Sequence, residues 1–149
     1  MSGLVCQKIR SVDISLALAG LSDTQFVDSG GTNGWTARPE WLQKFAEGLN
    51  LGGTIIYVWC RKLPAYQGIP PHVDISGHRA DTGRRFHIPI VTHPDVTMRW
   101  PDDGVEEHME AGYVYEINYL KKHEIVHKAN ADRIHVVVNV KDSTERAYV

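Results

Sequence analysis

The stretches RFHIPIVT (residues 85–92) and RIHVVVNV (residues 133–140) decide the fold class of this 149-residue chain. Both are rich in β-branched residues, which favour an extended backbone. Three further runs have a similar composition, and turn residues separate them all: Thr54–Cys60, Val96–Trp100 and Tyr113–Asn118. Short strands with few helices between them are typical of an antiparallel barrel or sandwich. We therefore predict a mainly β fold of the jelly-roll type.

The first fifty residues differ from this pattern. Residues 22–34 are rich in Gly, Ser, Asp and Thr, which indicates a loop. The segment PEWLQKFAEGL (residues 39–49) follows, and its large apolar residues recur at helical spacing: Trp41, Leu42, Phe45 and Leu49. Proline at the start and glycines beyond the end support this helix. No repeat divides the chain, so we expect a single domain over residues 1–149, with one or two N-terminal helices.

Composition limits the functional classes. The formal charge is −2 and the pI about 6.4, so there is no basic surplus to favour a nucleic-acid partner. Cys6 and Cys60 are the only cysteines, too few for a disulfide framework. No apolar run approaches the roughly 18 residues needed to cross a bilayer, and residues 1–5 do not show the charged and then apolar pattern of a secretory leader. We expect a cytoplasmic protein that binds a small molecule or peptide; the oligomeric state cannot be predicted.

All eight histidines lie at or beyond residue 72 and none in the first 71 residues, which suggests a metal or acid–base site. His72 and Asp74 are two residues apart in PPHVD, a spacing that on an extended segment places both side chains on one face. His123, after the strand YVYEIN, is the candidate third ligand. Two imidazoles and one carboxylate leave metal positions open, which suits Fe(II) holding a keto acid and O₂. His127, four residues further on, is a rival ligand on the same side of a strand.

An H-x-D triplet often occurs by chance, and His123 next to two lysines is equally compatible with an exposed histidine. Arg133 adds weight to the metal hypothesis, because it opens an apolar strand where its guanidinium would need an anionic partner. We interpret it as the anchor for the far carboxylate of a keto diacid. The segment 128–132 is rich in turn residues and should let this strand fold back against the one carrying His123. The alternative is an edge strand whose arginine pairs with Asp132 or a surface glutamate.

A cationic cluster lies between the H-x-D triplet and the next strand: His78, Arg79, Arg84, Arg85 and His87. Arg85 and His87 alternate with apolar residues, so both should face one side, which we take as the cavity. Arg79, Arg84 or Arg85 would receive an anionic part of the substrate. His135 is expected to be an interior, hydrogen-bonded histidine. Several aromatics could line the cavity, although a core role is the more common one: Trp35, Tyr57, Trp59, Tyr66 and Trp100.

The ordered motifs P-x-H-x-D, R-x-H-x-P-I, H-M-x-x-G-x-x-x-E-I-N, H-x-[IV] and R-I-H-[LV]-V span residues 63–140. This set resembles the aspartyl/asparaginyl β-hydroxylase family, and several linked motifs are more specific than any one of them. The resemblance implies a cupin-like double-stranded β-helix. It also implies Fe(II), 2-oxoglutarate and O₂ as reactants in a hydroxylation that releases succinate and CO₂.

Carried over residue by residue, the resemblance assigns His72 and His123 to the metal histidines. Asp74 corresponds to the carboxylate that amino-acid and proline hydroxylase members keep and the secretory-pathway member lacks. Arg133 corresponds to the arginine that binds the distal carboxylate of 2-oxoglutarate. His87 corresponds to a histidine near its other carboxylate, and Arg85 to an arginine that contacts co-substrate or an anionic substrate.

The chain departs from the family pattern at two places, with extra residues at 75–84 and with His127 where asparagine is usual. The expected function is hydroxylation of an amino acid, a peptide side chain or a small acidic metabolite. Two alternatives stay open. One is a cupin-like metal enzyme using zinc or manganese for hydrolysis or isomerisation, which would not need Arg133 as a keto-acid anchor. The other is a binding module that kept the fold without turnover.

Overall fold

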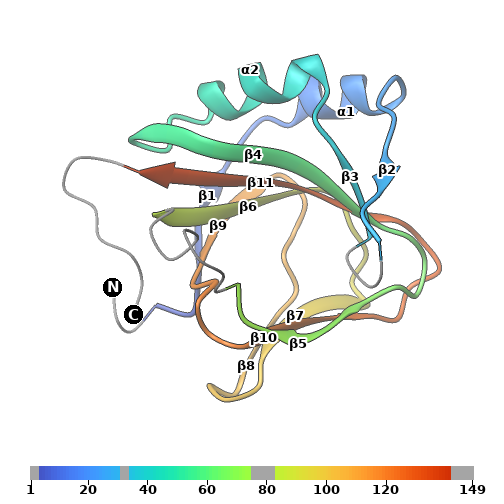
Figure 1. Ribbon diagram of the computed structural model, residues 1–149, viewed down its shortest axis with the longest axis vertical. Helices are drawn as coiled ribbons and strands as arrows, with labels where there is room; N and C mark the ends of the chain where they lie inside the picture. Colours follow the sequence, from blue (N-terminus) through green and yellow to red (C-terminus); the bar gives the residue numbers. More distant parts are fainter. Residues whose placement is uncertain (1–3, 31–33, 75–82, 142–149) are drawn as a thin grey trace.

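Two antiparallel sheets stacked face to face form the body of the protein, as the computed structural model shows for residues 4–30, 34–74 and 83–141 (Figure 1). The larger sheet has the strand order β1-β9-β6-β11-β4-β3-β2, and the smaller has the order β5-β10-β7-β8. The elements follow one another as β1 (Cys6–Ser11), α1 (Ser15–Leu21), β2 (Val27–Asp28), β3 (Trp35–Ala37), α2 (Glu40–Gly48), β4 (Thr54–Leu63), β5 (Ile69–His72), β6 (Arg84–Val91), β7 (Val96–Trp100), β8 (Val105–Glu107), β9 (Tyr113–Ile117), β10 (His123–His127) and β11 (Arg133–Lys141).

The larger sheet is covered on both faces. Helices α1 and α2 pack on its outer face (Figure 1), where an apolar core joins Leu42 and Phe45 of α2 to Ile88 of β6 and Val136 of β11. A second core fills the space between the two sheets, with Trp100 of the smaller sheet among its fully buried members. Burial of the apolar side chains in these two cores is the main force that holds the layers together.

Strands β6 and β11 therefore have no solvent-exposed face. Side chains alternate along each strand, so Phe86, Ile88 and Ile90 of β6 face the helices while Arg85 and His87 face the smaller sheet. The inner face of β11 carries Arg133, His135, Val137 and Asn139 in the same alternation, with a register shift between Ile134 and His135. Polar side chains are thus gathered on the inner face of the central strands, inside the protein.

The predicted fold class is confirmed, and helix 39–49 is found as α2. The prediction that the strand beginning at Arg133 folds back against the strand carrying His123 needs correcting. Strand β11 pairs with β4 and β6 in the larger sheet, whereas β10 pairs with β5 and β7 in the smaller one. Among the described residues, no helix is both long and apolar enough to span a membrane.

Candidate metal centre

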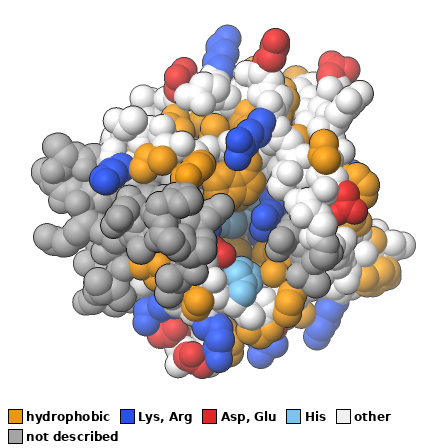
Figure 2. Space-filling model, in the orientation of Figure 1, with side chains coloured by type: hydrophobic (Ala, Val, Ile, Leu, Met, Phe, Trp, Pro, Cys, Tyr) orange, Lys and Arg blue, Asp and Glu red, His pale blue; other side chains and the backbone are white. Residues whose placement is uncertain are grey.

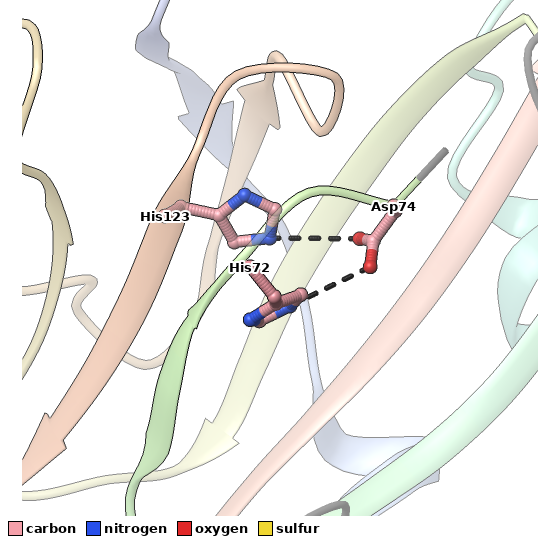
Figure 3. Close-up of side chains that lie close together, drawn as sticks. All are labelled: His72, Asp74 and His123. Atoms are coloured by element: carbon pink, nitrogen blue, oxygen red, sulfur yellow. Dashed lines mark ion pairs between the residues drawn. The ribbon is translucent and has the colours of Figure 1, made fainter. Parts of the chain in front are cut away.

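His72, Asp74 and His123 come together at the end of the smaller sheet (Figure 3). Strand β5 pairs with β10 so that His72 lies directly opposite His123, and their ring centroids are 4.4 Å apart. Asp74 follows β5, where its backbone N–H donates to the carbonyl of Tyr119. One carboxylate oxygen lies 3.5 Å from Nε2 of His72 and the other 3.5 Å from Nε2 of His123.

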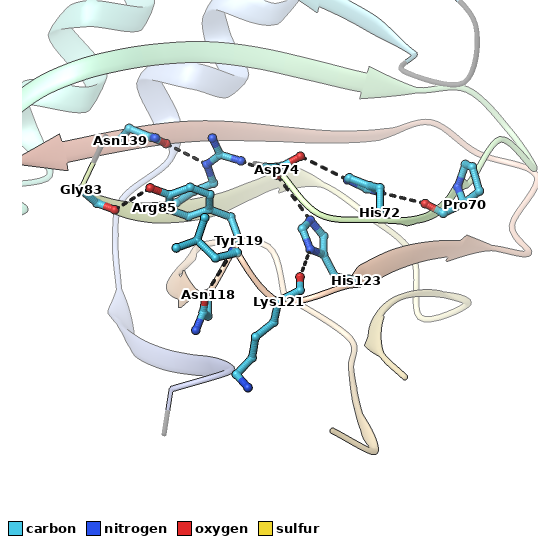
Figure 4. Close-up of polar contacts among 11 residues, drawn as sticks. Pro70, His72, Asp74, Gly83, Arg85, Asn118, Tyr119, Lys121, His123 and Asn139 are labelled. Carbon is cyan, nitrogen blue, oxygen red and sulfur yellow. Dashed lines mark hydrogen bonds and ion pairs between the residues drawn. The ribbon is translucent and has the colours of Figure 1, made fainter. Parts of the chain in front are cut away.

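Backbone carbonyls orient both imidazoles (Figure 4). Nδ1 of His72 lies 2.8 Å from the carbonyl of Pro70, and Nδ1 of His123 lies 2.7 Å from that of Lys121. A carbonyl only accepts hydrogen bonds, so each Nδ1 carries the proton, and in the neutral ring Nε2 presents a lone pair. Two lone pairs and a carboxylate then face one another within 4.8 Å, a repulsive arrangement that a cation relieves. Among the described residues, this is the one group of three such side chains that could hold a metal ion.

Asp74 is held as an anion by its neighbours. Burial alone would raise its pKa, but the nearby His123 and the guanidinium of Arg85 keep the pKa well below its usual value. Arg85 donates from Nη1 to Asp74 over 2.7 Å and from Nε to Asn139 over 2.8 Å (Figure 4). The guanidinium also lies over the ring of Tyr119, 4.3 Å from its centroid. Arg85 therefore orients the carboxylate that would bind the metal and keeps it ionised.

The side chains of His72, Asp74 and His123 border a cavity of about 40 Å³ between the sheets. The face in Figure 2 is hollowed at its centre, with histidine, basic and apolar side chains visible inside. The larger sheet contributes cationic and polar side chains to the lining, namely Arg61, Arg85, His87 and Arg133, and the smaller sheet contributes apolar ones, namely Ile69, Met98 and Ile125. Among the described residues of the lining, three guanidinium groups thus accompany one carboxylate, that of Asp74, which gives this part of the lining a positive balance.

Arg133 is the most unusual of these side chains. It is 1% exposed, and its Nε and Nη1 have no hydrogen-bond partner among the described residues. Burial and the nearby guanidinium of Arg61 lower the pKa of Arg133 to about 9. Since β11 lies in the middle of the larger sheet, the alternative of an edge-strand arginine paired with Asp132 is wrong. A buried cation with unsatisfied donors is costly, and an anionic ligand is its natural partner.

The remaining predicted residues lie as follows. His87 lines the cavity, and its Nδ1 is 2.9 Å from Nδ1 of His135, the buried hydrogen-bonded histidine that the sequence predicted. Arg84 does not line the cavity; it forms two hydrogen bonds with Glu116, at 2.8 and 2.7 Å. Arg79 and its neighbour His78 lie outside the described residues. His127 shares the inward face of β10 with His123 but does not belong to the metal cluster.

Sequence reasoning missed Arg61 and Asn139, and it favoured a core role for Trp59. The predicted strand ended at residue 60, whereas β4 continues to Leu63. Extending the alternation by one step would have placed Arg61 on the same face as Trp59, which also lines the cavity. Asn139 gave no such signal, because its partner Arg85 lies 54 residues away in the chain.

Comparison with known proteins adds a family and a fold. A family model described as "Aspartyl/Asparaginyl beta-hydroxylase" matches residues 42–143. A Pseudomonas putida prolyl-4-hydroxylase is similar in structure, with a TM-score of 0.64, 13% identity and 94% of each chain covered. A viral collagen prolyl hydroxylase from Paramecium bursaria Chlorella virus-1, solved with 2-oxoglutarate, has a TM-score of 0.60 at 11% identity and covers 93% of this chain and 98% of its own. No curated protein sequence matches significantly.

Proposed function

Because the chain belongs to the aspartyl/asparaginyl β-hydroxylase family, we propose that it is an Fe(II)- and 2-oxoglutarate-dependent oxygenase. It hydroxylates an amino acid, a peptide side chain or a small acidic metabolite and releases succinate and CO₂. Both prolyl hydroxylases that share its fold are named for a reaction of this type. Bound iron would supply the activation of O₂, and the protein supplies ligands, orientation and charge.

His72, Asp74 and His123 are the residues that would hold the iron. Their donor set fits Fe(II), because imidazole nitrogens combined with a single carboxylate are the ligands of non-haem iron oxygenases. The carbonyls of Pro70 and Lys121 hold both Nε2 lone pairs toward Asp74. Arg85 keeps that carboxylate ionised and fixes its direction. The chain's own contribution is therefore a preformed set of donors on the side of the cavity.

The observation that carries the proposal is that Nε and Nη1 of the buried Arg133 have no hydrogen-bond partner among the described residues. In this proposal its buried Nε and Nη1 donate to the distal carboxylate of 2-oxoglutarate. Such charge-assisted pairs are among the strongest hydrogen bonds in proteins. The excess of guanidinium groups over carboxylates in the cavity favours a dianionic ligand for the same reason.

The cavity must widen to admit this co-substrate. A volume of about 40 Å³ has room for roughly one water molecule, whereas 2-oxoglutarate is a five-carbon diacid. Trp59 and Arg61 line the cavity and are only partly buried, so they are the side chains best placed to move. We expect them to change conformation when the diacid binds.

Anaerobic spectroscopy tests this function. Addition of Fe(II) and 2-oxoglutarate should produce a visible charge-transfer band, and admission of O₂ should then release succinate. The D74A variant should lose the band. The matched control is D95A, which removes a 63% exposed carboxylate and should keep it. Wild-type protein that is folded and iron-loaded yet shows neither band nor succinate would refute the proposal.

A further inference from the structure

Two buried histidines share a hydrogen bond on the inner face of the larger sheet. His87 of β6 is 7% exposed and His135 of β11 is 2% exposed. The pairing of β6 with β11 places Val137 opposite His87, so His135 is the diagonal neighbour of His87 on the same face. Their Nδ1 atoms are 2.9 Å apart, and the rings meet edge to face at a centroid distance of 5.2 Å.

The two rings must be opposite tautomers. Burial lowers the pKa of both histidines well below 6.5, and the guanidinium of Arg133 acts in the same direction, so both rings are neutral. A neutral imidazole carries one N–H and one lone pair. In a hydrogen bond between two Nδ1 atoms, one ring donates and the other accepts. The ring that accepts at Nδ1 must carry its own proton on Nε2.

The surroundings decide which ring accepts once an anion is bound. His87 lines the cavity with Arg61 and Arg133, so its proton on Nε2 would become a donor beside the ligand. His135 instead borders a smaller space of about 10 Å³ with Arg133 and the apolar side chains Met98 and Met109. The guanidinium and the hydroxyl of Thr92, which also lines this space, can donate to a lone pair on Nε2 of His135, so that nitrogen needs no proton there. A bound carboxylate therefore favours donation from His135 to His87.

We propose that His135 is a positioning residue: its Nδ1–H donates to Nδ1 of His87 and so keeps the proton of His87 on Nε2, as a hydrogen-bond donor to the bound anion. This inference rests on the proposed function, because the anion is 2-oxoglutarate. His135 does not itself touch the ligand. It acts by removing the alternative tautomer, in which His87 would present a lone pair to a carboxylate and repel it.

Proton–nitrogen NMR correlations of the imidazoles test the tautomers directly. The protein is loaded with Zn(II) in place of iron and then with 2-oxoglutarate, without turnover. We expect His87 to be protonated at Nε2 and His135 at Nδ1. If 2-oxoglutarate binds while His87 carries its proton on Nδ1, the inference is wrong and the proposed function stands. If wild-type protein binds Zn(II) but not 2-oxoglutarate, the proposed function fails, and the inference fails with it.

Two variants of His135 distinguish its hydrogen bond to His87 from its contribution to core packing. His135→Asn keeps an N–H donor near the place of Nδ1, and His135→Leu keeps bulk without a donor. We expect the leucine variant to bind 2-oxoglutarate about tenfold more weakly, as for loss of one hydrogen bond to a charged group, and the asparagine variant to stay close to wild type. Zn(II) affinity should be unchanged in both. Equal losses in the two variants, or an unchanged affinity in the leucine variant, would overturn the inference.

Discussion

The buried pair His87 and His135 should make the stability of the metal-free protein fall in mildly acidic solution. Both pKa values are lowered well below 6.5 in the folded protein, so the unfolded chain binds protons that the folded chain does not. The free energy of unfolding is therefore highest above pH 6.5 and decreases as the pH falls below it. Between pH 7.0 and 5.5 the loss is about 1.3 kcal/mol for each histidine, or about 2.5 kcal/mol for the pair.

Urea unfolding at pH 7.0 and pH 5.5 measures this loss. His127 adds to it in the same direction, because burial also lowers its pKa, so the value for the pair is a minimum. The lowered pKa of Asp74 affects stability only below its unfolded value of 3.8, outside this window. The H135N variant should lose about 1.3 kcal/mol of the pH dependence. The control H93N, at a residue whose side chain is 44% exposed, should retain it all. Equal stability of the wild type at both pH values would show that these imidazoles are not held neutral.

Three further perturbations have distinct expected outcomes. Replacing Arg133 by methionine removes an unsatisfied buried cation, so the free energy of unfolding of the ligand-free protein should rise by about 1–3 kcal/mol. The same variant should bind 2-oxoglutarate about 100-fold more weakly in calorimetry. A variant less stable than the wild type would contradict this reasoning. Gly68→Ala should weaken Zn(II) binding, because a Cβ there meets the β10 backbone and pushes β5 away, whereas Gly48→Ala has open space and should bind normally. Arg84→Ala removes two hydrogen bonds to the buried carboxylate of Glu116 and should reduce stability by about 2–3 kcal/mol in urea unfolding. Zn(II) affinity should be unchanged, and a matching loss of Zn(II) affinity would place Arg84 in the site.

Long, strongly patterned elements could be predicted from the sequence, and short ones could not. The apolar periodicity of residues 39–49 located α2, and β-branched composition located β4, β6, β7, β9 and β11. Strands β2, β3, β5 and β8 have two to four residues each and exist because of their pairing partners. The five-residue β10, which carries His123, was expected as a strand from the alternation of His123, Ile125 and His127, but its pairing partners were not.

That His72, Asp74 and His123 lie close together could be predicted, because two of them share one H-x-D triplet and the third follows a recognisable motif. The contacts that tune them could not. In β6 the alternation with apolar residues predicted that Arg85 and His87 face the cavity, as they do, but it did not indicate which groups they contact there. Arg85 is hydrogen-bonded to Asp74 and Arg84 to Glu116 because of how strands distant in the sequence pack together. Two adjacent arginines in the sequence thus have unrelated roles in the structure.

Both faces of β6 and β11 are buried, and this limits where substitutions could give the protein a new substrate specificity. At the buried positions of these strands, a change on one face loosens the layer beneath the helices, and a change on the other disturbs the pocket, so none of those positions is neutral. Variation compatible with folding is then confined to the rim, and Trp59 of β4 is a natural starting point for directed evolution toward other substrates.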